Sequence, residues 1–202
     1  MITLYDFAPS GNSYRARLFL SLLGLGYEKS LIDLGAGQHK EAAYLKLNPL
    51  GQVPTLVDDG EVIRDSCAIL IYLSSKYDNT GNWSGKTAEE KAHIQEWLST
   101  ATREMMFGPA RARAIKLFGR PFDLQEAQAL AHQLFTDVME PHLQQNQWLA
   151  ASRPTIADIA SYAYVTVSDE GEVFLDNYPN IRRWLKDVEA LPGFVPMVRA
   201  GS

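Results

Sequence analysis

The amino-acid sequence predicts a two-part fold, an α/β unit followed by an all-α unit. The first 78 residues alternate strand-like and helix-like patterns in the order β-α-β-α-β-β-α, which is the order of a thioredoxin-like domain. Residues 79–86 are then polar and glycine-rich, as in a linker, and the rest of the chain is helical in composition. We therefore expect an N-terminal thioredoxin-like domain at 1–78, a linker at 79–86 and a C-terminal helical bundle domain at 87–202.

The first helix of the α/β unit follows a short strand expected at residues 2–5. Its apolar side chains recur at intervals that place them on one helical face: Ala16, Phe19, Leu20 and Leu23. Gly24 and Gly26 end this helix, and a second strand is expected at residues 28–32.

The second half of the α/β unit contains a predicted β-hairpin. An irregular helix is expected at residues 41–47, before the hairpin. Strands at 53–57 and 61–63 flank the turn Asp58-Asp59-Gly60, which is a strong hairpin signal. Ser66 then begins the last helix of the unit.

The second unit is predicted to hold several helices in sequence. Thr87 has the spacing of a helix N-cap, and Phe107-Gly108-Pro109 should break the long helix that follows it. Further helices are expected at 123–145, from Thr155 onward, and at 181–191 before a Pro-Gly stop. Thr155 and Asp158 fit a capping box, which is a folding element and not a ligand site.

Composition excludes several classes of function. The net charge of −5 gives no electrostatic support for general binding of nucleic acid or anionic membranes. Cys67 is the single cysteine, so no internal disulfide forms, and no cluster has metal-binding spacing. No apolar run is long enough to span a membrane, and the first residues lack the basic region of a signal peptide. These features predict a cytoplasmic protein that binds no metal.

Two neighbouring motifs carry the functional prediction. The first runs from Asn48 through Gln52-Val53-Pro54 to Leu56, and the second is Asp65-Ser66 at the start of a helix. Together with Pro9-Ser10-Gly11 after the first strand, they resemble the serine-type, theta- and phi-like bacterial members of the cytosolic glutathione transferase family. The resemblance covers essentially the whole chain. It implies an enzyme that uses glutathione as cosubstrate, in detoxification, and that forms a homodimer.

The chemistry implied by the resemblance needs a group that stabilises the glutathione thiolate. A free thiol has a pKa near ~8.5 and is mostly protonated at neutral pH, whereas the thiolate is the nucleophile. Ser10, at the start of the first helix, is the expected catalytic donor. Asn12 and Ser13 remain alternatives because they lie in the same segment, and Tyr5 because some classes use a tyrosine near the first strand.

The resemblance also implies a set of glutathione-binding residues. The backbone of Val53, before a cis Pro54, would pair with the cysteinyl residue of glutathione. Asp65 would receive the α-ammonium group, and Ser66 at its helix N-terminus would hold the α-carboxylate. Contacts with the remaining part of the tripeptide would come from His39, Lys40 and Gln52.

The electrophile pocket is expected between the first unit and the first long helix of the second. Its predicted lining combines a loop after the first strand with residues at helical spacing: Phe7, Pro9, Arg103, Met106, Phe107 and Arg111. Conjugation, displacement of a halide and reduction of a peroxide all fit such a site. The sequence does not distinguish among them.

Two other functions remain open from the sequence. The first is a non-catalytic glutathione-binding or scaffold protein of the same fold. The second is a reductase of disulfides or glutathionyl mixed disulfides. Such a reductase normally needs a cysteine near position 10, whereas Cys67 is expected to be a small buried residue. A dithiol redox site is excluded because the chain has no Cys-x-x-Cys motif.

Overall fold

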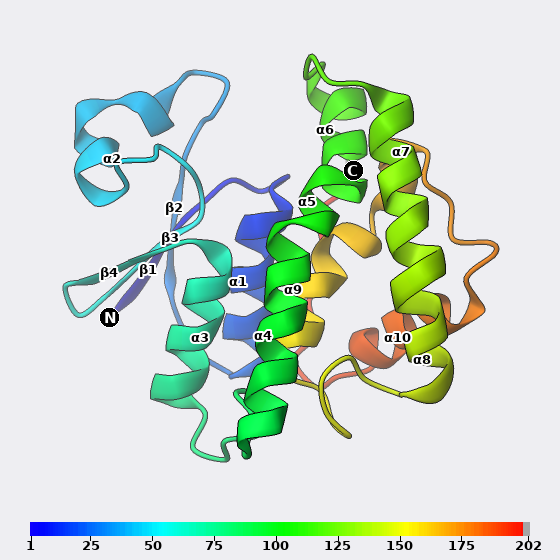
Figure 1. Ribbon diagram of the computed structural model, residues 1–202. Coiled ribbons are helices and arrows are strands. Elements are labelled where there is room, and N and C mark those ends of the chain that lie inside the picture. The colour runs from blue at the N-terminus through cyan, green and yellow to red at the C-terminus, as the bar shows by residue number, and fades with distance from the viewer. Residues whose placement is uncertain (200–202) are drawn as a thin grey trace.

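The structure is a computed structural model that describes residues 1–199 (Figure 1). Its first unit is the predicted thioredoxin-like arrangement. The elements are β1 (Ile2–Asp6), α1 (Gly11–Leu22), β2 (Glu28–Leu31), a 3₁₀ turn (Gln38–Lys40), α2 (Ala42–Leu47), β3 (Thr55–Asp58), β4 (Glu61–Arg64) and α3 (Ser66–Tyr77). The sheet order is β2-β1-β3-β4, with β1 parallel to β2 and antiparallel to β3. The predicted hairpin is the antiparallel β3–β4 pair.

The second unit is helical throughout its regular structure. It contains α4 (Ala88–Thr102), α5 (Glu104–Phe107), α6 (Pro109–Phe118), α7 (Leu124–Gln133), a π-helical segment (Leu134–Met139), α8 (Glu140–Gln145), α9 (Ile156–Val165), a 3₁₀ turn (Ser168–Gly171) and α10 (Pro179–Glu189). The last three positions of the predicted helical domain, 200–202, lie outside the described residues.

The long helix after the linker is broken twice, and sequence reasoning predicted one of these breaks. The break between α5 and α6 occurs at Gly108, before Pro109, as predicted. A second break occurs at Arg103, whose backbone leaves the helical region (φ −119°, ψ −80°). The predicted helix at 123–145 is interrupted differently, because a π-helical segment joins α7 to α8.

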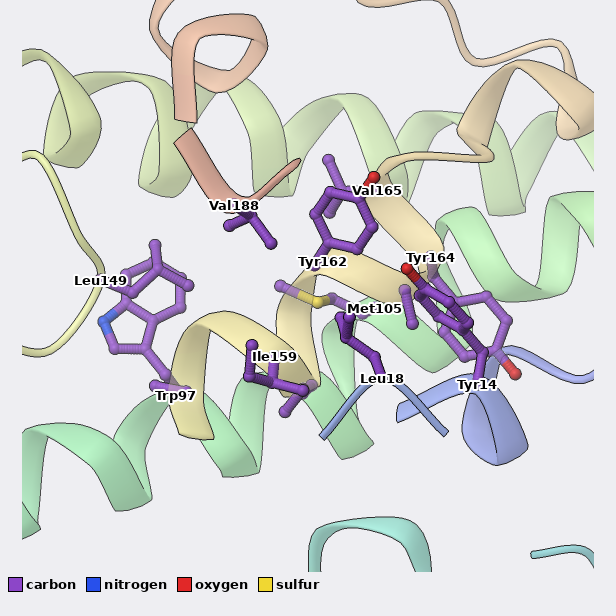
Figure 2. Close-up of a cluster of buried hydrophobic side chains, with 14 of the residues drawn as sticks. Tyr14, Leu18, Trp97, Met105, Leu149, Ile159, Tyr162, Tyr164, Val165 and Val188 are labelled. Carbon is purple, nitrogen blue, oxygen red and sulfur yellow. The ribbon is translucent and has the colours of Figure 1, made fainter. Parts of the chain in front are cut away.

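Helix α9 is the centre of the core. All ten of its residues are buried, and it packs against α1, α3, α4 and α10. In Figure 1, α1 and α3 lie between the sheet and the helical unit. Figure 2 shows Ile159, Tyr162 and Tyr164 of α9 beside Leu18 and Met105 from neighbouring helices. Because α9 contacts helices of both units, it fixes how the α/β unit sits on the helical unit.

The predicted capping box holds the N-terminus of α9. Thr155 and Asp158 exchange the two hydrogen bonds that define it, and both side chains are fully buried. Asp158 also accepts hydrogen bonds from the Leu149 N–H (3.0 Å) and from Trp184 Nε1 (2.9 Å). Burial raises the pKa of this carboxyl group, although the hydrogen bonds oppose that shift. Asp158 therefore ties α9 to α10 and to the segment before it.

Candidate functional site

Two adjoining cavities open where the loops of the α/β unit meet α4–α6. The first has a volume of about 560 Å³ and the second of about 500 Å³. We call them the peptide cleft and the apolar cleft. They share Ser10, Leu34 and Arg120. Ligands bound in the two cavities would therefore lie next to each other at these three residues.

The peptide cleft brings together residues from four separate segments of the first unit. The predicted site residues that line it are Ser10, Asn12, His39, Lys40, Gln52, Val53, Asp65 and Ser66. Pro54 does not line the cavity; it is buried and joined to Val53 through a cis peptide bond. Met106 of α5 closes the cavity from the helical unit.

Ser10 is the N-cap of α1. Its Oγ accepts a hydrogen bond from the Ser13 N–H (3.2 Å), so its lone pair satisfies an otherwise free helical donor. The hydroxyl proton remains available, because a serine hydroxyl both accepts and donates. The group thus combines a free O–H donor with the positive end of the α1 dipole.

The three alternative donors occupy different environments. Ser13 is fully buried, and its Oγ accepts from the Phe7 N–H (3.4 Å). The ring of Tyr5 packs edge-on against Tyr44, with centroids 5.9 Å apart. Asn12 lines the cavity, and its Oδ1 accepts from Arg15 (2.8 Å), which leaves the amide N–H groups for a ligand. Of the four predicted candidates, Ser10 and Asn12 line the cavity.

The segment around Val53 presents free backbone groups. Within residues 1–199 the N–H and C=O of Val53 have no hydrogen-bond partner. The preceding carbonyl, of Gln52, accepts from the Tyr44 hydroxyl (2.6 Å) and from Asn48 Nδ2 (2.8 Å). Asn48 is buried, so the side chains that anchor this loop come from inside the fold. An extended peptide backbone could pair with the exposed edge of Val53.

Asp65 and Ser66 form the start of α3. Asp65 lies in the left-handed region (φ 76°), and its Oδ1 caps the helix through the N–H groups of Cys67 (2.9 Å) and Ala68 (3.0 Å). Its Oδ2 makes no hydrogen bond within the described residues. Ser66 is almost fully buried at the cavity wall. An ammonium group and a carboxylate could therefore bind side by side here.

Arg15 is a site residue that sequence reasoning missed. Its side chain is 1% exposed and reaches the peptide cleft from α1. It donates to the carbonyls of Ala160 (2.7 Å) and Ala101 (3.0 Å), and also to Ser66 Oγ (3.1 Å). No carboxylate of the described residues forms an ion pair with it. A buried cation without an anion is costly, which indicates that a ligand supplies the negative charge.

The sequence held one signal for Arg15. Its spacing from Leu18 and Phe19 places it near the apolar face of the helix, whereas an arginine on such a helix is normally exposed. The periodicity alone could not show that the buried face of α1 meets α9 and α4.

The loop at 38–40 packs against the segment before Val53. Lys40 Nζ donates to the carbonyls of Leu50 and Gly51, both at 3.2 Å. A Cβ at Gly51 (φ 58°) would lie 2.7 Å from the His39 carbonyl oxygen, so glycine is needed for this close approach. His39 Nδ1 is buried without a partner among residues 1–199. A cationic and an imidazole group thus stand at one end of the cleft.

The six residues predicted to line the electrophile pocket are divided among three cavities. Phe7 and Pro9 line the apolar cleft, and Met106 lines the peptide cleft. Arg103, Phe107 and Arg111 instead line a separate cavity of about 520 Å³, together with residues of α7. Arg103, Phe107 and Arg111 follow one another at intervals of four residues and stay on one side of this stretch, whereas Met106 lies on another side and lines the peptide cleft.

The residues that complete the apolar cleft were not predicted. They come from the loop after β2, from α6 and the loop after it, and from α9: Leu34, Gly35, Ala110, Arg113, Ala114, Phe118, Arg120 and Tyr164. Tyr164 lies against the start of α1, where a Cβ at Gly11 would be 2.6 Å from its ring. Burial raises the pKa of Tyr164, so the phenol stays neutral.

Cys67 is buried, and burial raises the pKa of its thiol. Among residues 1–199, no group of three or more His, Cys, Asp or Glu side chains could hold a metal ion. No helix in that part of the chain is long and apolar enough to cross a membrane.

Comparison with known proteins gives a consistent result for both units. The family model described as the glutathione S-transferase N-terminal domain matches residues 1–75, and that of the C-terminal domain matches residues 113–192. Glutathione S-transferase 3 from Zea mays is 32% identical, over 98% of this chain and 94% of that protein. Disulfide-bond oxidoreductase YfcG from Escherichia coli is 28% identical, over 95% of this chain and 92% of that protein.

A solved structure agrees with the arrangement of the two units. The crystal structure of a glutathione S-transferase from Pseudomonas fluorescens superposes with a TM-score of 0.91 and 31% sequence identity. The superposition covers 98% of this chain and 99% of that one.

Proposed function

The chain belongs to the glutathione S-transferase family, and we propose that it binds reduced glutathione in the peptide cleft and conjugates it to a small electrophile. The observation that carries this proposal is the convergence of four segments on one cavity around the free backbone edge of Val53. The same cavity offers an acceptor for an ammonium group and two separate regions for carboxylates. Glutathione has this combination of groups.

Glutathione binding uses the backbone and both ends of the cleft. The cysteinyl residue pairs with Val53, as one short added strand. Asp65 Oδ2 receives the α-ammonium group, while Ser66 and Arg15 hold the adjacent α-carboxylate. His39, Lys40 and the amide of Gln52 bind the glycine carboxylate at the opposite end.

Thiolate formation follows from hydrogen bonding at the start of α1. Lowering a thiol pKa by about two units requires about 2.7 kcal/mol of preferential stabilisation of the thiolate. A hydrogen bond to a charged group contributes about 1.5–3 kcal/mol, and a helix N-terminus about 0.3–1 kcal/mol. The Ser10 hydroxyl and the α1 N-terminus together reach this value, and the Asn12 amide is a second donor at the same surface.

The reaction is nucleophilic attack by the thiolate on a molecule held in the apolar cleft. In a substitution, a carbon–sulfur bond forms while the leaving group departs with its electron pair. In an addition, the electrons move onto the activated double bond, which then takes a proton. In the reduction of a peroxide, the thiolate attacks one peroxide oxygen and the O–O bond breaks, which releases an alcohol or water and leaves a sulfenic acid. A second glutathione then displaces the sulfenic hydroxyl as water and forms glutathione disulfide. The protein's part is to bind, orient and stabilise the thiolate.

Isothermal titration calorimetry with glutathione tests the binding step. We expect micromolar-to-millimolar affinity in the wild type, and an ultraviolet thiolate band in the complex. Ser10→Ala and Asn12→Leu, separately and together, assign the donor by the loss of that band. Absence of glutathione binding in the wild type would favour a scaffold protein of the same fold and refute the proposal.

The Escherichia coli relative named as a disulfide-bond oxidoreductase makes disulfide reduction a second candidate. The protein itself does not supply the thiol for this activity, because Cys67 is buried and lines neither cleft. Such an activity would have to use glutathione itself as the thiol. An assay with a small disulfide and excess glutathione distinguishes it from conjugation.

We also propose a cytoplasmic homodimer with a role in detoxification, in keeping with the family. Exposed apolar side chains on the first unit, including Val62 of β4 and Ile71 of α3, are candidates for the subunit contact. Light scattering after size-exclusion chromatography measures the mass, which a monomer would place near 22.6 kDa.

A further inference from the structure

We propose that the electrophile conjugated by this protein carries a carboxylate, and that Arg120 and Arg113 select it. This inference rests on the proposed conjugation of glutathione and specifies the class of second substrate. It begins from the charges that line the two clefts. Four of the lining residues are basic (Arg15, Lys40, Arg113 and Arg120), whereas Asp65 is the one acidic residue, in a chain of net charge −5.

Arg120 is the first arginine whose guanidinium group is not used in the proposed binding of glutathione. Within residues 1–199 its exposed guanidinium group makes no hydrogen bond and no ion pair. It lines both clefts, so it stands at the junction between glutathione and the second substrate. Arginine presents a planar set of donors that matches a carboxylate in a bidentate arrangement.

Arg113 is the second arginine of the apolar cleft, and contacts within the protein hold its side chain in place. It is 3% exposed and lines the apolar cleft from α6. Its Nε pairs with Glu170, and its Nη1 donates to the Pro9 carbonyl (2.8 Å). Its Nη2 is buried and has no partner in the described residues. A buried donor in this state is satisfied when a ligand or an ordered water accepts from it.

The groups of glutathione do not require these two arginines. Its ammonium group and two carboxylates are matched by Asp65, by Ser66 with Arg15, and by the loop that carries Lys40. No acidic side chain lines the apolar cleft itself. An anionic second substrate would be repelled by the thiolate, and Arg120 between the two clefts offsets that repulsion.

The rest of the apolar cleft defines the body of the substrate. Phe7 and Phe118 line it, with their ring centroids 6.4 Å apart. Ala110 and Ala114 add a smooth helical wall. A volume of about 500 Å³ suits one small aromatic or aliphatic molecule. The structure therefore describes an apolar molecule with a carboxylate at one end.

The probes are a matched pair, a chloronitrobenzoate and its methyl ester. In each, the chlorine is para to the carboxyl group and ortho to the nitro group. In both, the glutathione sulfur bonds to the carbon that carries chlorine. The carbon–chlorine bond breaks, chloride leaves with the electron pair, and the thiol proton goes to solvent. Each kcat/KM is divided by the uncatalysed rate constant, because the ester activates the ring more strongly than the carboxylate does.

We expect the normalised kcat/KM of the wild type to favour the acid over the ester. Arg120→Gln should lower the value for the acid by about tenfold, which corresponds to about 1.4 kcal/mol, and leave the ester nearly unchanged. Arg103→Gln is the matched control, since it removes the same charge from an exposed arginine that lines a separate cavity. It should leave the preference intact.

The outcomes separate this inference from the proposed function. Turnover of the ester without a preference for the acid, or a preference that survives Arg120→Gln, would overturn the inference and leave conjugation standing. Failure to conjugate either probe, together with no glutathione binding, would refute both. Calorimetry with the two finished conjugates provides a readout independent of turnover, and equal affinities for them would also contradict the inference.

Discussion

The two clefts meet at Ser10, yet they are built in different ways. The peptide cleft is formed mainly by loops of the first unit, and its central contact is the backbone of Val53. The apolar cleft is formed by side chains of α6 and α9 against the loop after β1. Backbone groups are common to all residues, whereas side chains differ with every substitution. The peptide cleft is therefore suited to a ligand that stays the same when side chains change. The apolar cleft is suited to a second substrate whose identity depends on the side chains present.

The largest effect is expected at Arg15, which underlies the peptide cleft. Arg15→Met would remove the buried hydrogen bonds to the carbonyls of Ala101 and Ala160. We expect a loss of about 2–5 kcal/mol in the free energy of unfolding, measured in urea, and much weaker binding of glutathione. Arg15→Lys keeps the charge and should bind glutathione more tightly than Arg15→Met. Equal binding by the two variants would show that the charge has no role.

The second-largest effect is expected on catalysis, from substitution of Ser10, which lines both clefts. Ser10→Ala removes the donor to the thiolate, so kcat/KM should fall by an amount equivalent to about 1.5–3 kcal/mol. The affinity for glutathione should change little at a pH where the thiol is protonated. Ser10→Thr keeps a hydroxyl and is the matched control. An unchanged thiolate band in Ser10→Ala would assign the donor role to Asn12.

Gly11 tests whether the two clefts can be altered separately. A Cβ at this position would lie 2.6 Å from the Tyr164 ring, so Gly11→Ala should displace a wall of the apolar cleft. We expect a loss of about 1–3 kcal/mol in stability and a raised KM for the electrophile. Glutathione affinity, measured by calorimetry, should remain near the wild-type value. A parallel loss of glutathione affinity would mean that the clefts are coupled through α1.

The smallest effect is expected far from both clefts, at the ion pair of Glu90 with Arg153 (2.7 Å). The hydrogen bonds from Arg153 lower the pKa of Glu90 from 4.5 to about 2. A lowered pKa in the folded state means that this stabilisation is present above pH 4.5 and is lost as the pH falls towards 2. The thermal midpoints of wild type and Glu90→Gln should therefore differ slightly at neutral pH and converge in acid. A difference that stays constant with pH would contradict this assignment.

The local features of the first unit could be predicted from contiguous residues. The turn Asp58-Asp59-Gly60, the motif ending in Val53-Pro54 and the cap at Asp65-Ser66 each encode their backbone conformation within a few positions. Strand and helix order followed from them, and so did the thioredoxin-like fold. The peptide cleft could be anticipated because most of its residues lie in such motifs.

The apolar cleft could not be anticipated in the same way. Helical spacing kept Arg103, Phe107 and Arg111 together, but they line a cavity against α7, whereas Met106 lines the peptide cleft. A π-helical segment after α7 also interrupts the regular helical pattern. Helical spacing shows which side chains share a face, but it does not show which neighbouring element that face meets.

The sequence by itself determined the order of the elements, the loop that presents Val53 and the caps that begin α1, α3 and α9. These depend on local backbone preferences and on hydrogen bonds between residues close in the chain. Only the tertiary structure decided that Arg15 is buried, and that Arg113, Arg120 and Tyr164 meet Ser10. Those contacts join segments separated by about a hundred residues or more, and they depend on how α9 packs between the two units.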